Sequence, residues 1–259
     1  MGIFSKDPCV NCGTPVGLLS GGTKIADGHV CKACAALCSP FRKPGRATTA
    51  ADLASHLAYR AQNRAVFAAF IPTYSLGETN KLLIDYPHGV FVLASDAELG
   101  GGNPDVFRLD AVRKSDIRIT ESADRHNEDS VDCYYYSFFL ELRLDHPCVP
   151  FVSFRVNDRT VTAHRRPIDR SRIEQAISGE KNLHSGLLAR VVGLGDDRKA
   201  TEAYLGYYVL LQQMIASLAA ASPASPPAQP PVSSPKFCPY CGSPVSGGAF
   251  CAACGGKLS

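Results

Sequence analysis

The chain has 259 residues, of which 45% are hydrophobic and 20% are charged, which is ordinary for a globular protein. No apolar run is long enough to span a bilayer, and residues 1–8 lack the apolar segment of a signal peptide, so we expect a cytoplasmic protein. The length suits one sizeable core with small appendages, or two modest domains.

Near the N-terminus, two CxxC pairs are separated by eighteen residues and are formed by Cys9, Cys12, Cys31 and Cys34. Paired cysteines in an intracellular chain indicate zinc rather than disulfides. Gly13, directly after the first pair, can take the positive φ that such a turn needs. Cys38 could substitute as a ligand, but a buried apolar thiol is the simpler interpretation.

The next segment, residues 40–46, is basic and interrupted by prolines, as in a connector. Thr49 then resembles an N-cap followed by an acidic first turn at Asp52. Apolar residues at helical spacing predict a helix of about 20 residues that ends before Pro72.

From Lys81 onward the hydrophobic period changes to two, which predicts strands. Residues 81–86 and 90–94 form a plausible hairpin, and residues 95–103, with three glycines, predict a loop. Shorter strands are expected at residues 106–112 and 116–120. Residues 133–144 form the clearest strand, and its expected partner is residues 151–156.

Two helices are predicted after the strands. The first is short and covers residues 168–177. The second is long and covers residues 198–221, with a proposed buried stripe of Ala203, Tyr207, Leu210, Leu211, Met214 and Leu218. Consecutive antiparallel strands closed by a helix predict an α+β fold rather than βαβ units.

Residues 222–235 are rich in proline and serine, so we expect a semi-rigid linker. A second cysteine quartet follows the linker, formed by Cys238, Cys241, Cys251 and Cys254. Four cysteines leave no open position on a tetrahedral Zn²⁺, so both quartets predict structural zinc. Each Zn(Cys)₄ site lowers the formal charge by two, so two sites turn +3 into about −1. Overall charge therefore gives no support to a nucleic-acid partner.

The C-terminal motif, Cys238-Pro-Tyr-Cys241-Gly242 to Phe250-Cys251-Ala-Ala-Cys254-Gly255, resembles the short zinc ribbon that ends many bacterial regulatory and scaffold proteins. The N-terminal pattern of Cys9, Cys12-Gly13, Gly17-Leu18-Leu19, Asp27-Gly28 and Cys31-Lys32-x-Cys34 resembles the opening domain of an uncharacterised bacterial family. The Pro104-Asp-Val-Phe107 step, Ile117, Ile119 and the closing helix are similar to bacterial pleckstrin-homology-like domains. These resemblances imply an architecture and carry no activity.

The predicted organisation has five segments. They are an N-terminal four-cysteine zinc domain (1–40), a connector and helix (41–70), a pleckstrin-homology-like β domain with its C-terminal helix (71–221), a proline-rich linker (222–235) and a zinc ribbon (236–259).

The sequence contains no recognisable catalytic motif, so we expect a protein that is not an enzyme. Residues 121–132 are acidic and are the best candidate for a further metal or acid–base site, although a solvated loop is the simpler interpretation. We therefore expect a zinc-binding scaffold or adaptor that recognises a protein partner. Alternatives are a nucleic-acid-binding regulator, or a middle domain that binds anionic lipid headgroups. The first would use the zinc ribbons and two basic clusters, one formed by Arg42, Lys43 and Arg46 and the other by Arg165, Arg166, Arg170 and Arg172. The second would use the latter cluster alone.

Overall fold

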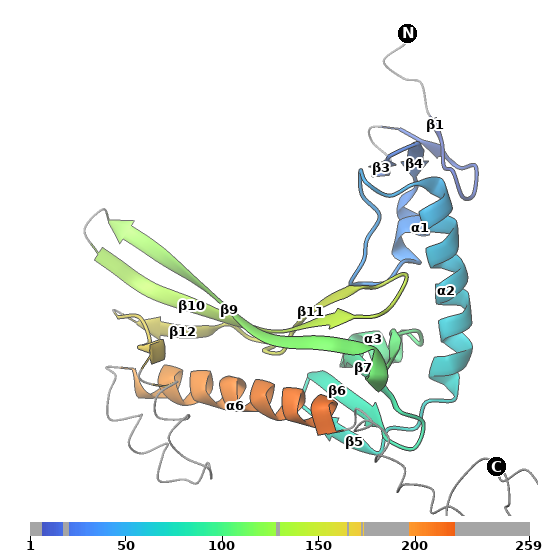
Figure 1. Ribbon diagram of the computed structural model, residues 1–259. Helices are drawn as coiled ribbons and strands as arrows, with labels where there is room; N and C mark the ends of the chain where they lie inside the picture. Colours follow the sequence, from blue (N-terminus) through green and yellow to red (C-terminus); the bar gives the residue numbers. More distant parts are fainter. Residues whose placement is uncertain are drawn as a thin grey trace, which may run out of the picture. The chain divides into compact units, whose positions relative to one another are not determined.

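The computed structural model describes residues 7–17, 21–127, 130–164, 166–171, 173 and 197–220. The chain divides into two compact units, Met1–Ser222 and Pro223–Ser259, and every element named below belongs to the first. The fold is mixed α+β, with antiparallel sheets and a C-terminal helix (Figure 1). No helix within the described ranges is both long enough and apolar enough to cross a bilayer.

The N-terminal part consists of two small antiparallel ribbons and a short helix. Strand β1 pairs with β2, and β3 pairs with β4. Their bounds are β1 (Asp7–Pro8), β2 (Pro15–Val16), β3 (Thr23–Ile25), β4 (Gly28–Val30) and helix α1 (Lys32–Ala36). Val16, Ile25 and Val30 form a small apolar core with Leu53 of the next helix.

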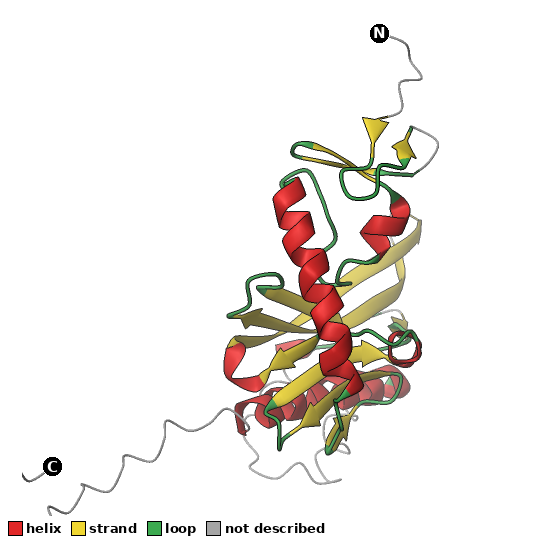
Figure 2. Cartoon of the chain, turned by 90° about the vertical axis from the view of Figure 1, so that its right-hand side faces the viewer, coloured by secondary structure: helices red, strands yellow, loops and turns green. Residues whose placement is uncertain are grey.

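Helix α2 (Ala50–Ala68) confirms the helix predicted before Pro72. Its N-terminus carries a complete capping box: the Thr49 hydroxyl accepts a hydrogen bond from the Asp52 backbone N–H, and the Asp52 carboxylate accepts one from the Thr49 backbone N–H. Figure 2 shows this helix running from the small N-terminal strands to the larger sheets.

The first larger sheet has the order β5-β6-β7-β8. Its strands are β5 (Tyr74–Leu76), β6 (Asn80–Asp85), β7 (Val90–Ser95) and β8 (Val106–Arg108). The predicted hairpin is confirmed, with Ile84 opposite Phe91. The single strand predicted over 106–112 is wrong, because β8 ends at Arg108 and a 3₁₀ turn, η1 (Leu109–Ala111), follows.

The prediction of a loop over residues 95–103 is also wrong in part, because helix α3 (Asp96–Gly100) begins there. Ser95 and Glu98 form a second capping box, in which the Glu98 carboxylate accepts a 2.8 Å hydrogen bond from the Ser95 backbone N–H. This capping box starts a short helix after Ser95, and the helix ends at the glycines that follow, with Gly101 as its C-cap.

The second larger sheet is built around one long hairpin. Its strands are β9 (Val112–Asn127), β10 (Ser130–Leu144), β11 (Phe151–Arg155) and β12 (Val161–His164). Strand β10 pairs with β9 along most of its length, and its other edge pairs with β11 and β12. The predicted strand at 133–144 and its partner at 151–156 are therefore confirmed.

The acidic segment 121–132 is mostly not a loop. Glu121 lies in β9 opposite Tyr136, and Asp124 lies opposite Cys133, so strand pairing extends the hairpin through residues that sequence composition assigned to a turn. The strand prediction at 116–120 was too short for the same reason.

Helix α6 (Arg198–Ala220) confirms the predicted long helix and packs on the second sheet. Tyr204 makes edge contacts with Tyr136 and Phe138, at ring-centroid distances of 5.3 and 4.9 Å. Leu211, Met214 and Leu218 are buried as predicted, and Tyr204 is buried in addition to them. Residues 174–177 of the short helix predicted before it, the linker and the ribbon lie outside the described residues.

Candidate metal centre

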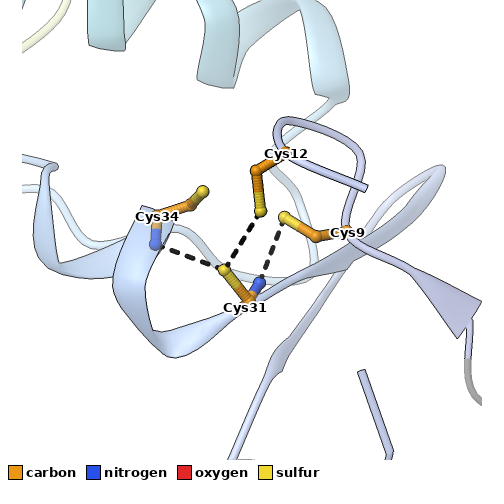
Figure 3. A group of neighbouring side chains, drawn as sticks. All are labelled: Cys9, Cys12, Cys31 and Cys34. Atoms are coloured by element: carbon orange, nitrogen blue, oxygen red, sulfur yellow. Dashed lines mark hydrogen bonds between the residues drawn. The ribbon is translucent and has the colours of Figure 1, made fainter. Parts of the chain in front are cut away.

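Four sulfur atoms converge at the N-terminal module. The Sγ atoms of Cys9, Cys12, Cys31 and Cys34 all lie within 4.8 Å of one another (Figure 3). Two of the cysteines come from the turn after β1 and two from the start of α1. The structure therefore brings together all four ligands that the two N-terminal CxxC pairs predicted.

The first pair is held by a tight turn. The Gly13 backbone N–H donates to the Cys9 carbonyl at 2.8 Å, and the Cys9 backbone N–H donates to the Thr14 carbonyl at 2.8 Å. Gly13 has φ of +72°, as its position after the pair predicted. This turn directs both sulfurs to the same side of the chain.

The second pair is held by the N-terminus of α1. Cys31 is the N-cap, and its Sγ accepts a hydrogen bond from the Cys34 backbone N–H at 3.4 Å. The backbone N–H of Cys31 donates in turn to Cys9 Sγ at 3.3 Å (Figure 3). The two CxxC turns are therefore hydrogen-bonded through the sulfur atoms themselves.

The sulfur spacing suits a tetrahedral zinc ion. A regular tetrahedron with Zn–S bonds of roughly 2.3 Å has S–S edges of about 3.8 Å. The Cys12–Cys31 Sγ separation is 3.6 Å, and no disulfide joins the four cysteines. All four positions of such an ion would be filled by protein, which leaves no site for water or substrate.

The surroundings of the sulfurs favour negative charge at two of them. Burial raises the pKa of Cys9, but hydrogen bonds from the backbone N–H groups of Cys31, Cys12 and Asn11 lower it by more. The net pKa is about 6. The hydroxyl of Thr14 lowers the pKa of Cys12. These donors are the kind of surrounding hydrogen bonds that stabilise metal-bound thiolates.

The sulfur of Cys34 has the opposite character. Burial and the neighbouring cysteines raise its pKa to about 12, although the Asn11 side chain donates to its Sγ at 3.2 Å. A group of thiolates this close repels further negative charge, and a divalent cation among them removes that repulsion. Asn11 was not predicted as a site residue; its place between two cysteines was the available signal.

The other candidate ligands do not join this cluster. Cys38 is buried, and its Sγ points to the Cys34 carbonyl at 4.0 Å, which supports its interpretation as an apolar thiol. In the described part of the chain, the acidic residues after Thr120 form no group that could hold a metal. The second quartet, Cys238, Cys241, Cys251 and Cys254, lies outside the described residues.

The module is joined to the larger sheets by a buried polar cluster. Asp105 is fully buried just before β8, and its carboxylate accepts hydrogen bonds from Ser39 at 2.6 Å and from Tyr59 at 3.1 Å. Arg60 pairs with the same carboxylate at 2.6 Å. Ser39 also donates its backbone N–H to His56 Nε2 at 2.9 Å. We call Ser39, His56, Tyr59, Arg60 and Asp105 the Asp105 cluster.

Two further contacts strengthen this junction. Phe41 lies against Phe107 and Phe154, with ring centroids 6.1 and 6.5 Å away. Asn63 of α2 accepts a hydrogen bond from the Val106 backbone N–H at 2.9 Å and donates one to the Pro104 carbonyl at 2.7 Å. Sequence reasoning missed this junction because its partners are more than forty residues apart.

Comparison with known proteins gives one match. Residues 8–56 match a domain family of unknown function, DUF4428. No curated protein and no solved structure matches the chain. The matched segment contains all four clustered cysteines and extends into α2 past Leu53, which closes the core beneath them. Residues 8–56, which include this cysteine module, are thus similar to a domain family of unknown function.

Proposed function

We propose that the N-terminal quartet holds one structural Zn²⁺. The convergence of four sulfurs within 4.8 Å carries this proposal. The ion would be held by Cys9, Cys12, Cys31 and Cys34, and it would stabilise the small core formed by Val16, Ile25, Val30 and Leu53.

We further propose a second structural zinc ion in a ribbon at residues 236–259, held by Cys238, Cys241, Cys251 and Cys254. Its support is the CxxC spacing and the proline-rich linker that precedes it. The metal-type spacing of the paired cysteines also supports the proposal of a cytoplasmic location.

Metal analysis of the full chain tests both sites. We expect two zinc ions per wild-type chain, one each after Cys34→Ser or Cys251→Ser, and none after both changes. Zinc that remains at the wild-type level after Cys34→Ser would contradict the N-terminal site, as would a disulfide within the quartet of the freshly purified, unreduced protein.

For the middle of the chain we propose a pleckstrin-homology-like domain. The order β5-β6-β7-β8, the second sheet around β10 and the closing helix α6 support this architecture. Because the N-terminal cysteines leave no open metal position, we propose that the protein acts by binding and not by catalysis.

A groove beside α6 supports the role of an adaptor for a protein partner. It has a volume of about 360 Å³ and lies between α6 and the turns that follow β5 and β11. Ala203, Tyr207 and Leu210 line it, and of these Tyr207 and Leu210 are also partly buried against the core. Glu78 and Asp158 add two carboxylates to the lining. An apolar side chain flanked by basic residues on a partner segment would match this surface.

Gly206 allows the groove to be blocked without disturbing the core. A Cβ at this exposed position in α6 would meet no atom within 4 Å. We expect Gly206→Arg to remove a partner captured by the wild-type protein, and Gly206→Ala to retain it while stabilising the helix by about 1 kcal/mol. Capture from nuclease-treated extract with zinc retained is the measurement. Equal capture by the alanine and arginine variants would rule out the groove.

A further inference from the structure

One side of the second sheet faces solvent and carries both aromatic and basic side chains. Strand alternation places Leu140, Leu142 and Phe138 in the core, so the residues between them point away from it. We call this side the outer face. It comprises Lys114, Asp116 and Arg118 of β9, Phe139, Glu141 and Arg143 of β10, and Phe151, Ser153 and Arg155 of β11.

These nine residues form three rows across the strands. Lys114, Arg143 and Phe151 are direct neighbours in the first row. Asp116, Glu141 and Ser153 form the second, and Arg118, Phe139 and Arg155 form the third. Helix α6 packs against the opposite side of the hairpin, where Tyr204 meets Phe138 (Figure 1).

The carboxylates of the outer face are already neutralised within it. Lys114 pairs with Asp116 at 2.8 Å, and Arg118 pairs with Glu141 while its guanidinium lies 4.0 Å above the centre of the Phe139 ring. Each carboxylate therefore has its own cation, and neither is left to neutralise the two remaining arginines.

Arg143 and Arg155 are these remaining cations. Within the described residues Arg143 has no hydrogen bond or ion pair, and Arg155 donates only to the neutral side chains of Asn157 and Thr160. Arg143 is exposed and stands directly opposite Lys114, which is a like-charge pairing that destabilises an antiparallel sheet. A bound anion would offset this repulsion.

An aromatic ring is available beside these charges. Phe151 pairs directly with Arg143 across the strands and is 43% exposed, so its ring is accessible beside this cation. Bases of single-stranded nucleic acid stack on such rings while nearby cations contact the phosphates. A duplex would satisfy the cations but would keep its bases stacked away from the ring.

We propose that the outer face binds single-stranded nucleic acid, with a base stacked on Phe151 and phosphates held by Arg143 and Arg155. This surface differs from the groove beside α6, so a protein partner and a nucleic acid would bind at different places. It also differs from the arginine cluster at residues 165–172, which sequence reasoning linked to the same class of ligand.

The test is the fluorescence anisotropy of a labelled oligothymidylate of about 16 nucleotides, titrated with the full zinc-loaded chain at several salt concentrations. Arg143→Gln should weaken binding by about 5-fold at 0.1 M salt and reduce the slope of log affinity against log salt by about 0.7. Phe151→Ala should weaken binding by about 5- to 150-fold, and Phe151→Tyr should retain it.

Arg198→Gln is the matched control. Arg198 is also exposed but lies on α6 and pairs with Glu202, so its loss should leave the affinity unchanged. Circular dichroism checks that each variant remains folded.

Three results would overturn the proposal. The first is no binding of the oligonucleotide at low salt. If the chain then binds vesicles of anionic lipid instead, the outer face or another surface recognises a lipid headgroup and the proposal is wrong. The second is an unchanged affinity in folded Arg143→Gln and Phe151→Ala variants, which would place any binding elsewhere. The third is tighter binding of a duplex of the same length than of the single strand.

Discussion

The hydroxyl of Ser39 donates a 2.6 Å hydrogen bond to the carboxylate of Asp105, a residue 66 positions further along the chain. Ser39 follows the cysteine module directly, and Asp105 precedes β8 of the larger sheets. Because Tyr59 and Arg60 of α2 meet the same carboxylate, three segments of the chain share one buried negative charge. The cysteine module and the sheets are therefore joined through a specific polar contact.

Asp105→Asn should destabilise the protein strongly. The change keeps the shape of the side chain but leaves the Arg60 guanidinium, only 11% exposed, without its counter-charge. Breaking one partner of a buried pair typically costs about 3–5 kcal/mol of unfolding free energy. Urea denaturation followed by circular dichroism measures the loss.

The matched control is Asp96→Asn, which breaks an exposed pair with Lys81 and should shift the midpoint little. Similar shifts in the two variants would refute the special role of Asp105.

Gly13→Ala should weaken zinc binding through the backbone alone. The added Cβ meets no atom within 4 Å, but φ of +72° is unfavourable for alanine by about 1–2 kcal/mol. We expect a loss of about 5- to 30-fold in zinc affinity, measured by competition with a chromophoric chelator. Gly45→Ala adds a methyl group in equally open space without a positive φ, and should leave the affinity unchanged. A loss of the same size at Gly45 would show that the effect is not specific to the cysteine turn.

His56 should make stability depend on pH. Burial lowers its pKa, with Asp105 acting in the opposite direction and Arg42, Arg60 and His146 acting in the same direction. The unfolded chain therefore binds a proton at higher pH than the folded chain does, so stability should fall as pH drops below about 6.5. The Ser39 backbone N–H, which donates to Nε2, is incompatible with a protonated ring.

His56→Gln should retain an acceptor for Ser39 and make the fall in stability with acid less steep. Urea midpoints measured from pH 7 to pH 5 test this, with zinc release monitored in the same samples because acid also displaces metal. Burial also lowers the pKa of His146, so some pH dependence should remain in the single variant. An unchanged slope would show that His56 does not contribute.

Cys251→Ser should affect the C-terminal part of the chain alone. The change removes one ligand of the proposed second zinc ion, and the proline-rich linker separates that ribbon from the first compact unit. We expect the main thermal transition to keep its midpoint while one zinc ion per chain is lost. A lower midpoint for the main transition would contradict the independence of the two parts.

Local sequence signals predicted much of the fold. The strict alternation from Tyr134 to Leu144 predicted the strand β10, because a period of two is typical of a strand with one buried side. Every second residue from Tyr136 to Leu144 is indeed buried. Thr49 and Asp52 predicted the start of α2, because both partners of the capping box lie within one turn. The first cysteine quartet was equally predictable, since metal ligation requires those residue types at that spacing.

The failures concern features that depend on distant contacts. Glu121 and Asp124 lie in an acidic segment whose composition is typical of a loop. Pairing with β10 nevertheless makes both residues part of strand β9. Ala203 has core spacing on α6 but is exposed, and Tyr207 and Leu210 of the same stripe are only partly buried against the core. The Asp105 cluster joins residues that no local pattern connects. The complete burial of Asp105 could not be predicted from the sequence, because charged residues are usually exposed.

The shared charge of Asp105 also has a practical consequence for anyone who wishes to study the sheets in isolation. A shortened chain that begins at residue 71 would keep β5 to β12 and α6, but it would lose every partner of Asp105 named above. It would also uncover Phe107 and Phe154 where Phe41 now lies, and leave the Val106 backbone N–H without Asn63. Such a fragment should be prone to aggregation and proteolysis. A chain shortened after Ser222, by contrast, should keep the first compact unit folded and monodisperse.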